Sequence, residues 1–568
     1  MRIIHAVDST YAGRTLLLGA AAGLVAIAGA SAADLPVKAK PVQYVKICSL
    51  YGAGYYYIPG TDTCIKLSGY MRADANINGG NYNKPGWDQG NAEGTKSRDR
   101  DYFTTRVRTE LQIDTRTQTE YGVLRTYMNP RFQFDTGALP ETGVLTLDYG
   151  FVQFAGFTFG KAVSVFQTPW GATGANSLTS FLIGGYDNVN GITQIAYTWQ
   201  LGNGVSASVA AEDNRVINRA QLLNASLTQP ATGVFTGAFT NSYGGNVTPD
   251  FVGNIRVEQA AFTAQLSGGA HNIHANYYAG PGGAAPVEPN GHPDDTWGFA
   301  VMGGLQLKNL PTGPGDKLSL DASYVNGASK YLIGGVTGTA FDSFGGGSPV
   351  FAGSYQTMAV LSLLDGVYTT GGKIEKTSGW GFRGGFVHNW SPTWETGIFG
   401  SYSRIEYNAN GAAAFCSAFT ALSPKSNGFT CNPNFSIWQV GQRTAWTPVK
   451  NLTFSVEVLY TMLDQSHTGS QTLTNPGPLT GTFKPTAVYD FKDQGVVSGV
   501  IGVRRTYLSL TTSEENAAAQ GGVFMTATIS CRGGFPDAGS RVSSAWAPVP
   551  ASTTARSDIA SASAGTSH

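Results

Sequence analysis

Charged residues are scarce in this chain. Only 13 % of its 568 residues are Asp, Glu, Lys or Arg, and 37 acidic residues balance 37 basic ones for a formal net charge of +0. A soluble globular chain usually carries about a quarter charged residues, so the composition is unusual for that class. The lack of a basic surplus also argues against nucleic acid as a partner, because little positive charge remains to neutralise phosphates.

Long apolar runs are also missing beyond the N-terminus, which excludes membrane-spanning helices of about 20 residues there. The one sustained run, Leu16 to Ile27, follows Arg14 and is closed by small residues that end at Ala32. This pattern predicts a secretory signal over residues 1–32. The alternative, an N-terminal anchor helix, is disfavoured because the run is short and ends in small residues.

Instead of long runs, the chain contains strict alternation. In one stretch the even positions hold Arg106, Arg108, Glu110, Gln112, Asp114, Arg116 and Gln118, and the positions between them hold Val107, Leu111 and Ile113 with Thr109 and Thr115. Residues 65–76 and 452–462 repeat this pattern. A period of two places successive side chains on opposite faces of a strand, so each strand separates a polar side from an apolar side. Together with the low charge, this predicts an all-β transmembrane antiparallel barrel rather than a soluble sandwich.

Alternating runs bounded by Gly, Pro, Asn and Asp predict about sixteen strands, an even number as in bacterial outer-membrane barrels. The predicted starts lie near Cys64, Tyr102, Glu120, Val144, Phe157, Gly191, Gly204, Phe251, Ala260, Thr296, Lys317, Lys376, Trp394, Phe435, Leu452 and Gln494.

The predicted connections alternate between short and long. Short ones lie at 202–204, 391–393 and 448–451, and long ones at 78–101, 214–249, 327–372 and 408–434. In such barrels short turns face the periplasm and long loops face outward. Four tryptophans lie beside short turns and predict a periplasmic aromatic girdle: Trp199, Trp390, Trp394 and Trp446.

One loop, from Thr168 to Asn190, is too apolar for an ordinary outward loop. It carries Trp170, Phe181, Leu182, Ile183 and Tyr186. We expect it to fold back into the lumen and to narrow a barrel that side chains alone cannot fill. The alternative is a surface loop that exposes these apolar residues.

Five cysteines suit an exported protein. The pairs Cys48 with Cys64 and Cys416 with Cys431 each predict a short disulfide-closed loop, and Cys531 is left over. Neither pair has the spacing or the second ligand cluster of a zinc site, so we expect no metal.

A family resemblance rests on one long string and several shorter ones. The segment AADLPVKAKPVQYVKICSLYGAGYYYIPGTDTCIKLSGYMR, from Ala32 to Arg72, closely resembles the start of mature alphaproteobacterial porins related to the Brucella and rhizobial major outer-membrane proteins. The resemblance continues through residues 147–166, 250–260, 438–460 and 493–505. It implies a barrel domain over residues 33–507 in the outer membrane of a Gram-negative bacterium. It also implies a homotrimer in which the third outer loop forms the constriction.

The resemblance further implies the function and the partners. We expect a porin that forms a water-filled channel for passive diffusion of small hydrophilic solutes and ions, without a cofactor. Expected partners are outer-membrane lipid and lipopolysaccharide, and the barrel assembly machinery during biogenesis. The alternative is a secreted or outer-membrane β-rich adhesin without channel activity.

Candidate pore residues follow from the alternation. Five arginines fall on predicted lumen faces of the first three strands: Arg72, Arg106, Arg108, Arg116 and Arg125. Within the loop from Thr168 to Asn190, only Asp187 is acidic. A positive wall opposite a negative loop would orient solutes in the constriction, as the resemblance implies. Alternatively, the arginines hydrate the lumen or pair with Glu110 and Asp114.

Catalytic patterns are missing from the sequence. His271 and His274 are spaced like a ligand pair, but on a strand that spacing points them to opposite faces. No metalloprotease helix motif, nucleophile elbow or phosphate loop is present, so we expect no enzyme. Only about thirty residues lie between Ala33 and Cys64, too few for the plug domain of an energy-coupled receptor.

The C-terminus departs from the family pattern. Porins end on an aromatic residue that closes the last strand, and the equivalent residue here is Tyr507. Residues 508–568 are rich in Ala, Ser, Gly and Thr and show no sustained alternation. We interpret them as the product of a frameshift or a lost stop codon, and their composition predicts a disordered extension.

Overall fold

A computed structural model describes residues 46–78, 102–136, 143–171, 174–176, 182–187, 190–229, 239–334, 340–345, 355–421, 428–473 and 487–507. The predicted signal segment at 1–32 and the predicted extension at 508–568 lie outside these residues, and so do Phe181 and Cys531.

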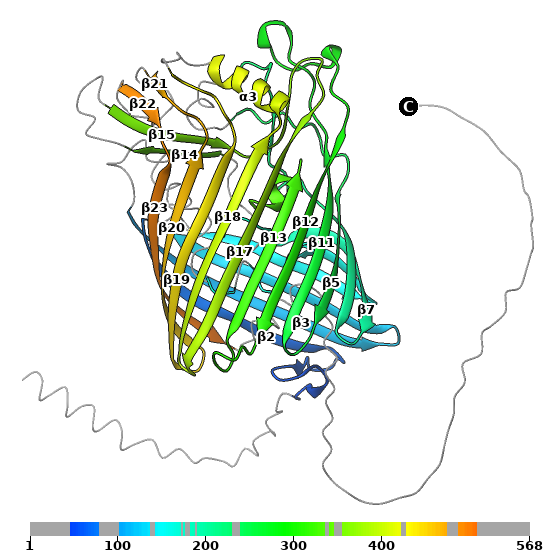
Figure 1. Ribbon diagram of the computed structural model, residues 1–568. Helices are drawn as coiled ribbons and strands as arrows, with labels where there is room; N and C mark the ends of the chain where they lie inside the picture. Colours follow the sequence, from blue (N-terminus) through cyan, green and yellow to red (C-terminus); the bar gives the residue numbers. More distant parts are fainter. Residues whose placement is uncertain are drawn as a thin grey trace, which may run out of the picture. The chain divides into compact units, whose positions relative to one another are not determined.

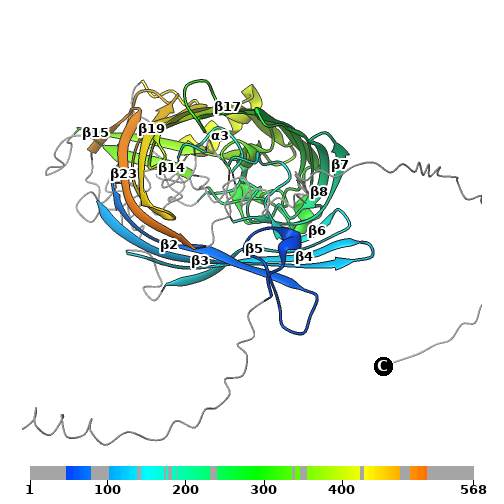
Figure 2. The ribbon, with the colours of Figure 1, turned by 90° about the horizontal axis from the view of Figure 1, so that it is seen from below.

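Sixteen antiparallel strands form a closed barrel (Figures 1 and 2). They are β2 (Cys64–Ile77), β3 (Phe103–Thr119), β4 (Gly122–Asp135), β5 (Val144–Phe154), β6 (Phe157–Ala162), β7 (Ile192–Gly202), β8 (Val205–Glu212), β10 (Asp250–Glu258), β11 (Phe262–Ile273), β12 (Thr296–Lys308), β13 (Lys317–Asn326), β17 (Glu375–Ser391), β18 (Trp394–Tyr407), β19 (Phe435–Val449), β20 (Leu452–Gln465) and β23 (Gln494–Tyr507). Each pairs with the next in this order, and β23 pairs with β2 from Gly69 opposite Tyr507 to Ile77 opposite Gly499. Closure leaves the barrel wall without an edge strand.

The predicted fold class is confirmed, and the predicted strand starts lie close to the observed ones. Every predicted start lies within two residues of the start of a barrel strand. The agreement has a physical cause, because the period of two and the turn residues that interrupt it are both local properties of the chain.

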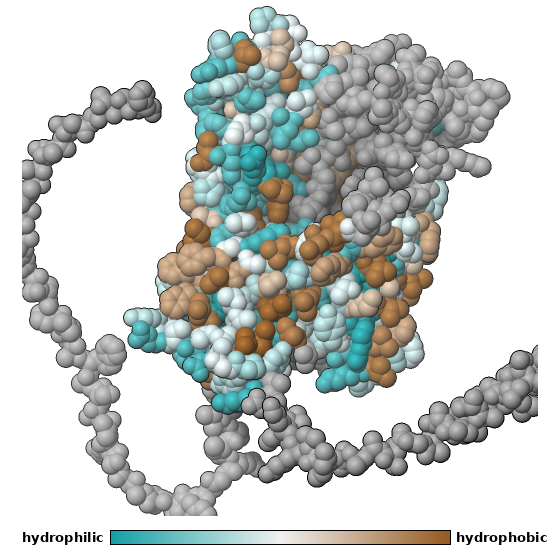
Figure 3. All heavy atoms as spheres, turned by 180° about the vertical axis from the view of Figure 1, so that it is seen from behind, coloured by the Kyte–Doolittle hydropathy of each residue, from teal (hydrophilic) through white to brown (hydrophobic). Residues whose placement is uncertain are grey.

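The barrel wall is apolar outside and polar inside. On β3, Arg106 points inward and is 1 % exposed, whereas its neighbour Val107 points outward and is 42 % exposed. Phe132 on β4 and Ile398 on β18 also face outward, at 52 % and 57 %. Hydrophobic side chains gather over the lower part of the wall in Figure 3, and hydrophilic ones predominate toward the upper end. A soluble protein has the opposite arrangement, with apolar side chains inside. An apolar outer face suits a wall that contacts hydrocarbon.

One rim of the barrel, which we call the short-turn rim, carries the connections at 119–122, 154–157, 202–205, 258–262, 391–394 and 449–452. Asn203 and Asn451 adopt positive φ values of 51° and 67° in two of these turns. Asn tolerates this left-handed conformation better than most residues, which is why it suits such tight connections.

The predicted girdle tryptophans lie near this rim and face outward. Trp199, Trp390, Trp394 and Trp446 are all exposed, and the rings of Trp394 and Trp446 stack with centroids 5.7 Å apart. Exposed tryptophans are not confined to this rim. Trp297 begins β12 and Trp380 lies near the start of β17, both toward the opposite rim, and both are exposed. Each interface of a membrane favours aromatic rings, so a second girdle has the same physical basis.

The opposite rim, which we call the long-loop rim, carries structure that the periodicity did not predict. It comprises a four-stranded sheet of β14 (Ala340–Gly345), β15 (Tyr355–Ser362), β22 (Ala487–Phe491) and β21 (Ser470–Leu473), and the helix α3 (Ala409–Ala421). We call this sheet and helix the cap (Figure 1). The predicted disulfide Cys416–Cys431 is present and ties α3 to the chain that leads into β19.

The helix has a local explanation. Its sequence is rich in Ala, the best helix former, and the Asn408 side chain accepts a hydrogen bond from the Gly411 N–H at 2.7 Å as an N-cap. In the part of the chain that the structure describes, no helix is both long and apolar enough to cross a membrane.

Candidate pore-lining site

The five predicted arginines all point into the barrel. Arg72 lies on β2, Arg106, Arg108 and Arg116 on β3, and Arg125 on β4. Neighbouring groups cover most of the surface of four of them, and the Arg116 side chain is 19 % exposed. Arg106 and Arg116 are ten residues apart on one strand, which corresponds to roughly 33 Å at about 3.3 Å per residue. The arginines therefore form a ladder along the wall rather than one ring, and we call them the arginine ladder.

Carboxylates on the same wall accompany this ladder. Asp114 lies 3.1 Å from Arg116 and 2.9 Å from Arg125, and Arg72 lies 2.9 Å from Asp74. Arg106 pairs with Asp135 on β4. Glu110, the other expected partner, accepts hydrogen bonds from the amides of Gln112 and Asn129 at 2.9 and 3.1 Å. Pairing within the wall holds the guanidinium groups in fixed positions while both charges face the lumen.

Two further arginines extend the ladder. Arg504 on β23 stands directly across from Arg72, which in turn stands across from Arg108, so three arginines lie abreast on adjacent strands. Arg504 also lies over the Tyr70 ring at 4.0 Å. Arg131 on β4 pairs with Asp148 on β5 at 2.6 Å. The alternation of β4 predicts that Arg131 faces the lumen. The row of Arg504, Arg72 and Arg108 depends on barrel closure, which the spacing of residues in the sequence does not show.

The loop between β6 and β7 folds into the barrel, as predicted. Of its expected residues, Thr168, Trp170 and Tyr186 are buried, and Phe181 lies outside the described residues. The amide of Gln265 on β11 donates to the carbonyl oxygens of Phe166 and Gln167 at 3.3 and 2.9 Å. The described parts of the loop therefore contact the inner wall. We call residues 163–191 the inward loop.

Asp187 lies near the end of this loop and is buried. Its carboxylate accepts a hydrogen bond from the amide of Gln167 at 3.3 Å, within the same loop. The acid that the sequence singled out is thus held on the inward loop, on an element separate from the arginine ladder.

A second inward segment, which the sequence analysis missed, packs against the inward loop. It includes a turn of 3₁₀ helix at Ser329–Tyr331, and the ring of Tyr331 stacks on that of Tyr186 with centroids 5.2 Å apart. Ile333 forms a parallel bridge with Gly185. Burial lowers the pKa of Lys330 in this segment to about 7, although nearby Asp365 opposes the shift. The sequence signal was weak, because the segment is short and lies within a long Gly-rich loop.

Buried carboxylates hold this second segment in place. Asp365, on the short strand β16 (Leu364–Tyr368), accepts hydrogen bonds from the Ser329 N–H and the Tyr243 hydroxyl, both at 2.7 Å. β16 pairs in parallel with β9 (Gln221–Asn224). The Tyr331 hydroxyl donates to Asp250 at 2.7 Å. These bonds link residues that are 36, 122 and 81 positions apart in the sequence.

The two histidines singled out by their spacing bind different carboxylates. His271 Nδ1 lies 2.8 Å from Asp250 in a fully buried position, and His274 Nδ1 lies 2.8 Å from Asp295 in a part-exposed one.

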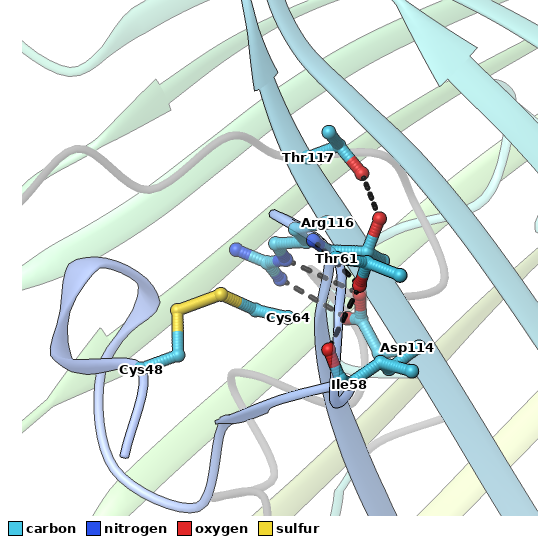
Figure 4. The surroundings of a disulfide bond; sticks show 8 residues. Cys48, Ile58, Thr61, Cys64, Asp114, Arg116 and Thr117 are labelled. Carbon is cyan, nitrogen blue, oxygen red and sulfur yellow. Dashed lines mark hydrogen bonds and ion pairs between the residues drawn. A yellow bond between two sulfur atoms is a disulfide. The ribbon is translucent and has the colours of Figure 1, made fainter. Parts of the chain in front are cut away.

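The predicted disulfide Cys48–Cys64 closes a small loop at the short-turn rim, next to Arg116 (Figure 4). The rings of Tyr51 and Tyr55 lie 5.7 and 5.1 Å from the Arg116 guanidinium, in the geometry of a cation–π contact. Burial and the nearby Asp114 raise the pKa of Tyr55. The N-terminal loop therefore covers Arg116, at the end of the arginine ladder nearest the short-turn rim.

A family model described as "Porin subfamily" matches residues 34–500. The chain belongs to this porin family. The porin is therefore an integral β-barrel protein of the outer membrane. The family points to a channel rather than an enzyme, and the adhesin alternative is not favoured.

Individual relatives match a part of the porin. Porin Omp2b of Brucella suis is 35% identical over 213 residues, which cover 35% of this chain and 51% of the relative. Porin Omp2a of Brucella ovis is 35% identical over 224 residues, covering 35% and 59%. The chain thus spans about half the length of these curated relatives. The outer membrane channel DcaP of Acinetobacter baumannii shares the fold, with a TM-score of 0.50 at 17% identity over 79% of this chain and 99% of that one.

Proposed function

We propose that this porin forms a water-filled channel through which small hydrophilic solutes and ions diffuse passively across the outer membrane. One observation supports this most directly. The sixteen strands close into a barrel whose outer face is apolar and whose inner face carries charged and amide side chains. Such a wall is compatible with hydrocarbon outside and water inside, so it lowers the free energy of polar solutes inside the membrane.

We assign the constriction to the inward loop together with the arginine ladder. Arg72, Arg106 and Arg108 stand on the part of the ladder above Arg116 and Arg125, which lie near the short-turn rim. Asp187, with Thr168, Trp170, Phe181 and Tyr186, belongs to the inward loop. Charges of opposite sign on two separate elements would create a field across the lumen that orients solutes and sets ion preference.

The assembly proposals extend this assignment. We propose a homotrimer in the outer membrane, in contact with lipid and lipopolysaccharide and inserted by the barrel assembly machinery. The apolar outer wall supports these contacts, because it offers surface to both lipid and neighbouring barrels. Residues 1–32 are proposed to be removed as a signal peptide, because a short apolar run that ends in small residues is typical of such signals.

Single-channel recording in a planar bilayer tests the channel directly. We expect stepwise conductance from the folded full-length protein, in triplets if it is a trimer, and a reversal potential in a salt gradient that gives the ion preference. Replacing Arg72 and Arg108 by Gln removes two positive charges from the row of three, so the reversal potential should shift toward that of a more cation-selective channel. A folded protein without any conductance would contradict the channel. An unchanged reversal potential would contradict the role of the row.

A further inference from the structure

The tip of the inward loop, residues 182–187, is docked on the barrel wall rather than extended across the lumen. The Ile183 N–H donates to the Gln439 side chain on β19 at 2.8 Å. The Gly184 N–H donates to the Leu332 carbonyl at 3.1 Å, which ties the tip to the second inward segment. These are single hydrogen bonds between neutral groups, which contribute about 1 kcal/mol each.

A charged group makes a further contact with the wall. Arg383 on β17 stands directly across from Asp321 on β13, and its Nε and Nη2 lie 2.9 and 2.8 Å from the two carboxylate oxygens. The same guanidinium donates from Nη2 to the Tyr186 carbonyl at 3.1 Å and reaches the Leu182 carbonyl from Nη1 at 3.5 Å. Both side chains are fully buried, with 0% of each exposed.

Only arginine suits this position. Its planar guanidinium carries five N–H groups in a fixed fork, so it can bind a carboxylate through two of them and still donate to two carbonyl oxygens. A lysine ammonium has three donors on one atom and cannot span these acceptors. Asp321 therefore fixes the orientation of Arg383, and Arg383 holds the loop.

The loop side of the contact is equally tight. A Cβ atom added at Gly185 would lie 2.6 Å from both Arg383 Nε and the Asp321 carboxylate. At Gly184, where φ is +123°, a Cβ would lie 2.6 Å from the Tyr402 carbonyl oxygen. Two successive glycines let the loop backbone approach the ion pair within hydrogen-bonding distance.

The anchor lies across the lumen from the arginine ladder. In the ring of strands β13 is eight strands away from β4, so the two are diametrically opposed among sixteen. We propose that Arg383, oriented by Asp321, is the positioning residue that pins the tip of the inward loop to the wall opposite the arginine ladder and so sets the width of the pore. This role rests on the proposed channel function, because a pinned tip matters only if solutes pass beside it.

Two sets of variants separate the anchor from general stability. The paired change Asp321→Asn with Arg383→Gln removes the guanidinium without leaving one buried charge unpaired, which single changes would do. Gly185→Ala keeps both charged residues of the pair and displaces the loop from the other side, because the added Cβ would clash with them. As a matched control, Glu395→Gln with Arg443→Gln removes another lumen-wall pair, 2.7 Å apart, for which the described residues show no hydrogen bond to the inward loop.

Hydrogen exchange of the folded full-length protein gives the first readout. We expect the N–H groups of Ile183 and Gly184 to exchange faster in the paired Asp321/Arg383 variant and in Gly185→Ala, and at the parental rate in the control. Heat-modifiable migration on a gel verifies that each barrel has folded. Unchanged exchange at these two N–H groups in folded variants would overturn the anchor, whatever the conductance.

Single-channel current gives the second readout. A released tip should raise the current noise of the open state and lower the voltage at which the channel closes, in both test variants and not in the control. If the parental protein conducts no current, the channel function fails while the exchange result still decides the anchor. Test variants that conduct with parental noise and closing voltage would contradict control of pore width by Arg383.

Discussion

At the scale of single residues, Asp114 shows how the lumen holds its charge. It bridges Arg116 on its own strand and Arg125 on the next, and all three side chains face inward. Removing one partner of such a buried set is strongly destabilising, because it leaves an uncompensated charge. The arginine ladder is therefore a network of ion pairs, and the effect of replacing one member depends on its partners.

Protonation of His467 should control how the stability of the cap depends on pH. It lies beyond the end of β20, is 3 % exposed, and its ring stacks on that of Phe419 with centroids 5.1 Å apart. The ring of Phe491 lies 5.5 Å away, and His467 Nδ1 accepts a hydrogen bond from the Asn432 N–H at 3.1 Å. Burial lowers the pKa of His467 to about 4.

We predict that acid loosens the cap through this residue. The folded pKa of about 4 lies below the ordinary value of 6.5, so between these values the unfolded cap binds more protons than the folded one. Stability is therefore full above pH 6.5 and falls as the pH drops toward 4, by up to about 3 kcal/mol. Hydrogen-exchange protection of α3 across this range measures the loss. His467→Phe should flatten the profile, and an equal slope in both proteins would contradict the prediction.

At the scale of elements, the two disulfides stabilise opposite rims of the barrel. Cys48–Cys64 closes the N-terminal loop against Arg116, and Cys416–Cys431 connects α3 to the chain before β19. The first joins the N-terminal loop to the start of wall strand β2, and the second joins two segments outside the barrel wall. The wall strands themselves are already held by continuous hydrogen bonding between neighbours.

Removing the second disulfide should therefore weaken the cap and spare the barrel. Its two cysteines are 15 residues apart, a spacing for which loop closure contributes about 3 kcal/mol. In the paired change Cys416→Ser with Cys431→Ser, we expect proteolytic cleavage near α3 and unchanged heat-modifiable migration. The matching change of Cys48 and Cys64 to Ser should leave α3 protected. Equal protease resistance in the parental protein and the Cys416/Cys431 variant would refute the assignment.

At the scale of the whole molecule, closure of the ring decides the fold. β23 pairs with both β20 and β2, and its last residue, Tyr507, donates a hydrogen bond from its hydroxyl to the Glu110 carbonyl at 2.9 Å. All sixteen wall strands thus lie between Cys64 and Tyr507.

We predict that a chain ending at Tyr507 forms the same barrel. It contains every wall strand, and it ends on an aromatic residue in the position that the family uses for closure. Heat-modifiable migration and single-channel conductance should match those of the full chain, and the folded fraction should be equal or higher. Failure of the shortened chain to fold, with the full chain folding normally, would show that residues beyond Tyr507 are needed.

Sequence reasoning succeeded where the signal was local. Alternation placed Arg72, Arg108 and Arg125 on the inner face, and turn residues located the ends of the strands. It missed the cap, whose strands are short and whose helix stands alone in a long loop. It also missed Arg383, which reads as one more charged residue in a Gly-rich strand. The constriction roles of the ladder and of Asp187 stay predictions that the conductance experiments test.

The barrel could be predicted from the residues alone, with its number of strands, its inner and outer faces, its disulfide pairs and its inward loop. The strands and their faces depend on neighbours a few residues apart, and the loop on its own apolar composition. The disulfides join cysteines 16 and 15 residues apart. The arrangement of the lumen depends instead on contacts between residues that are far apart in the sequence. Arg383 reaches the Tyr186 carbonyl across 197 residues of sequence, and Arg504, Arg72 and Arg108 meet only because the last strand closes on the first. Such contacts arise from side-chain packing and from closure of the barrel. The alternation of residues along one strand does not predict them.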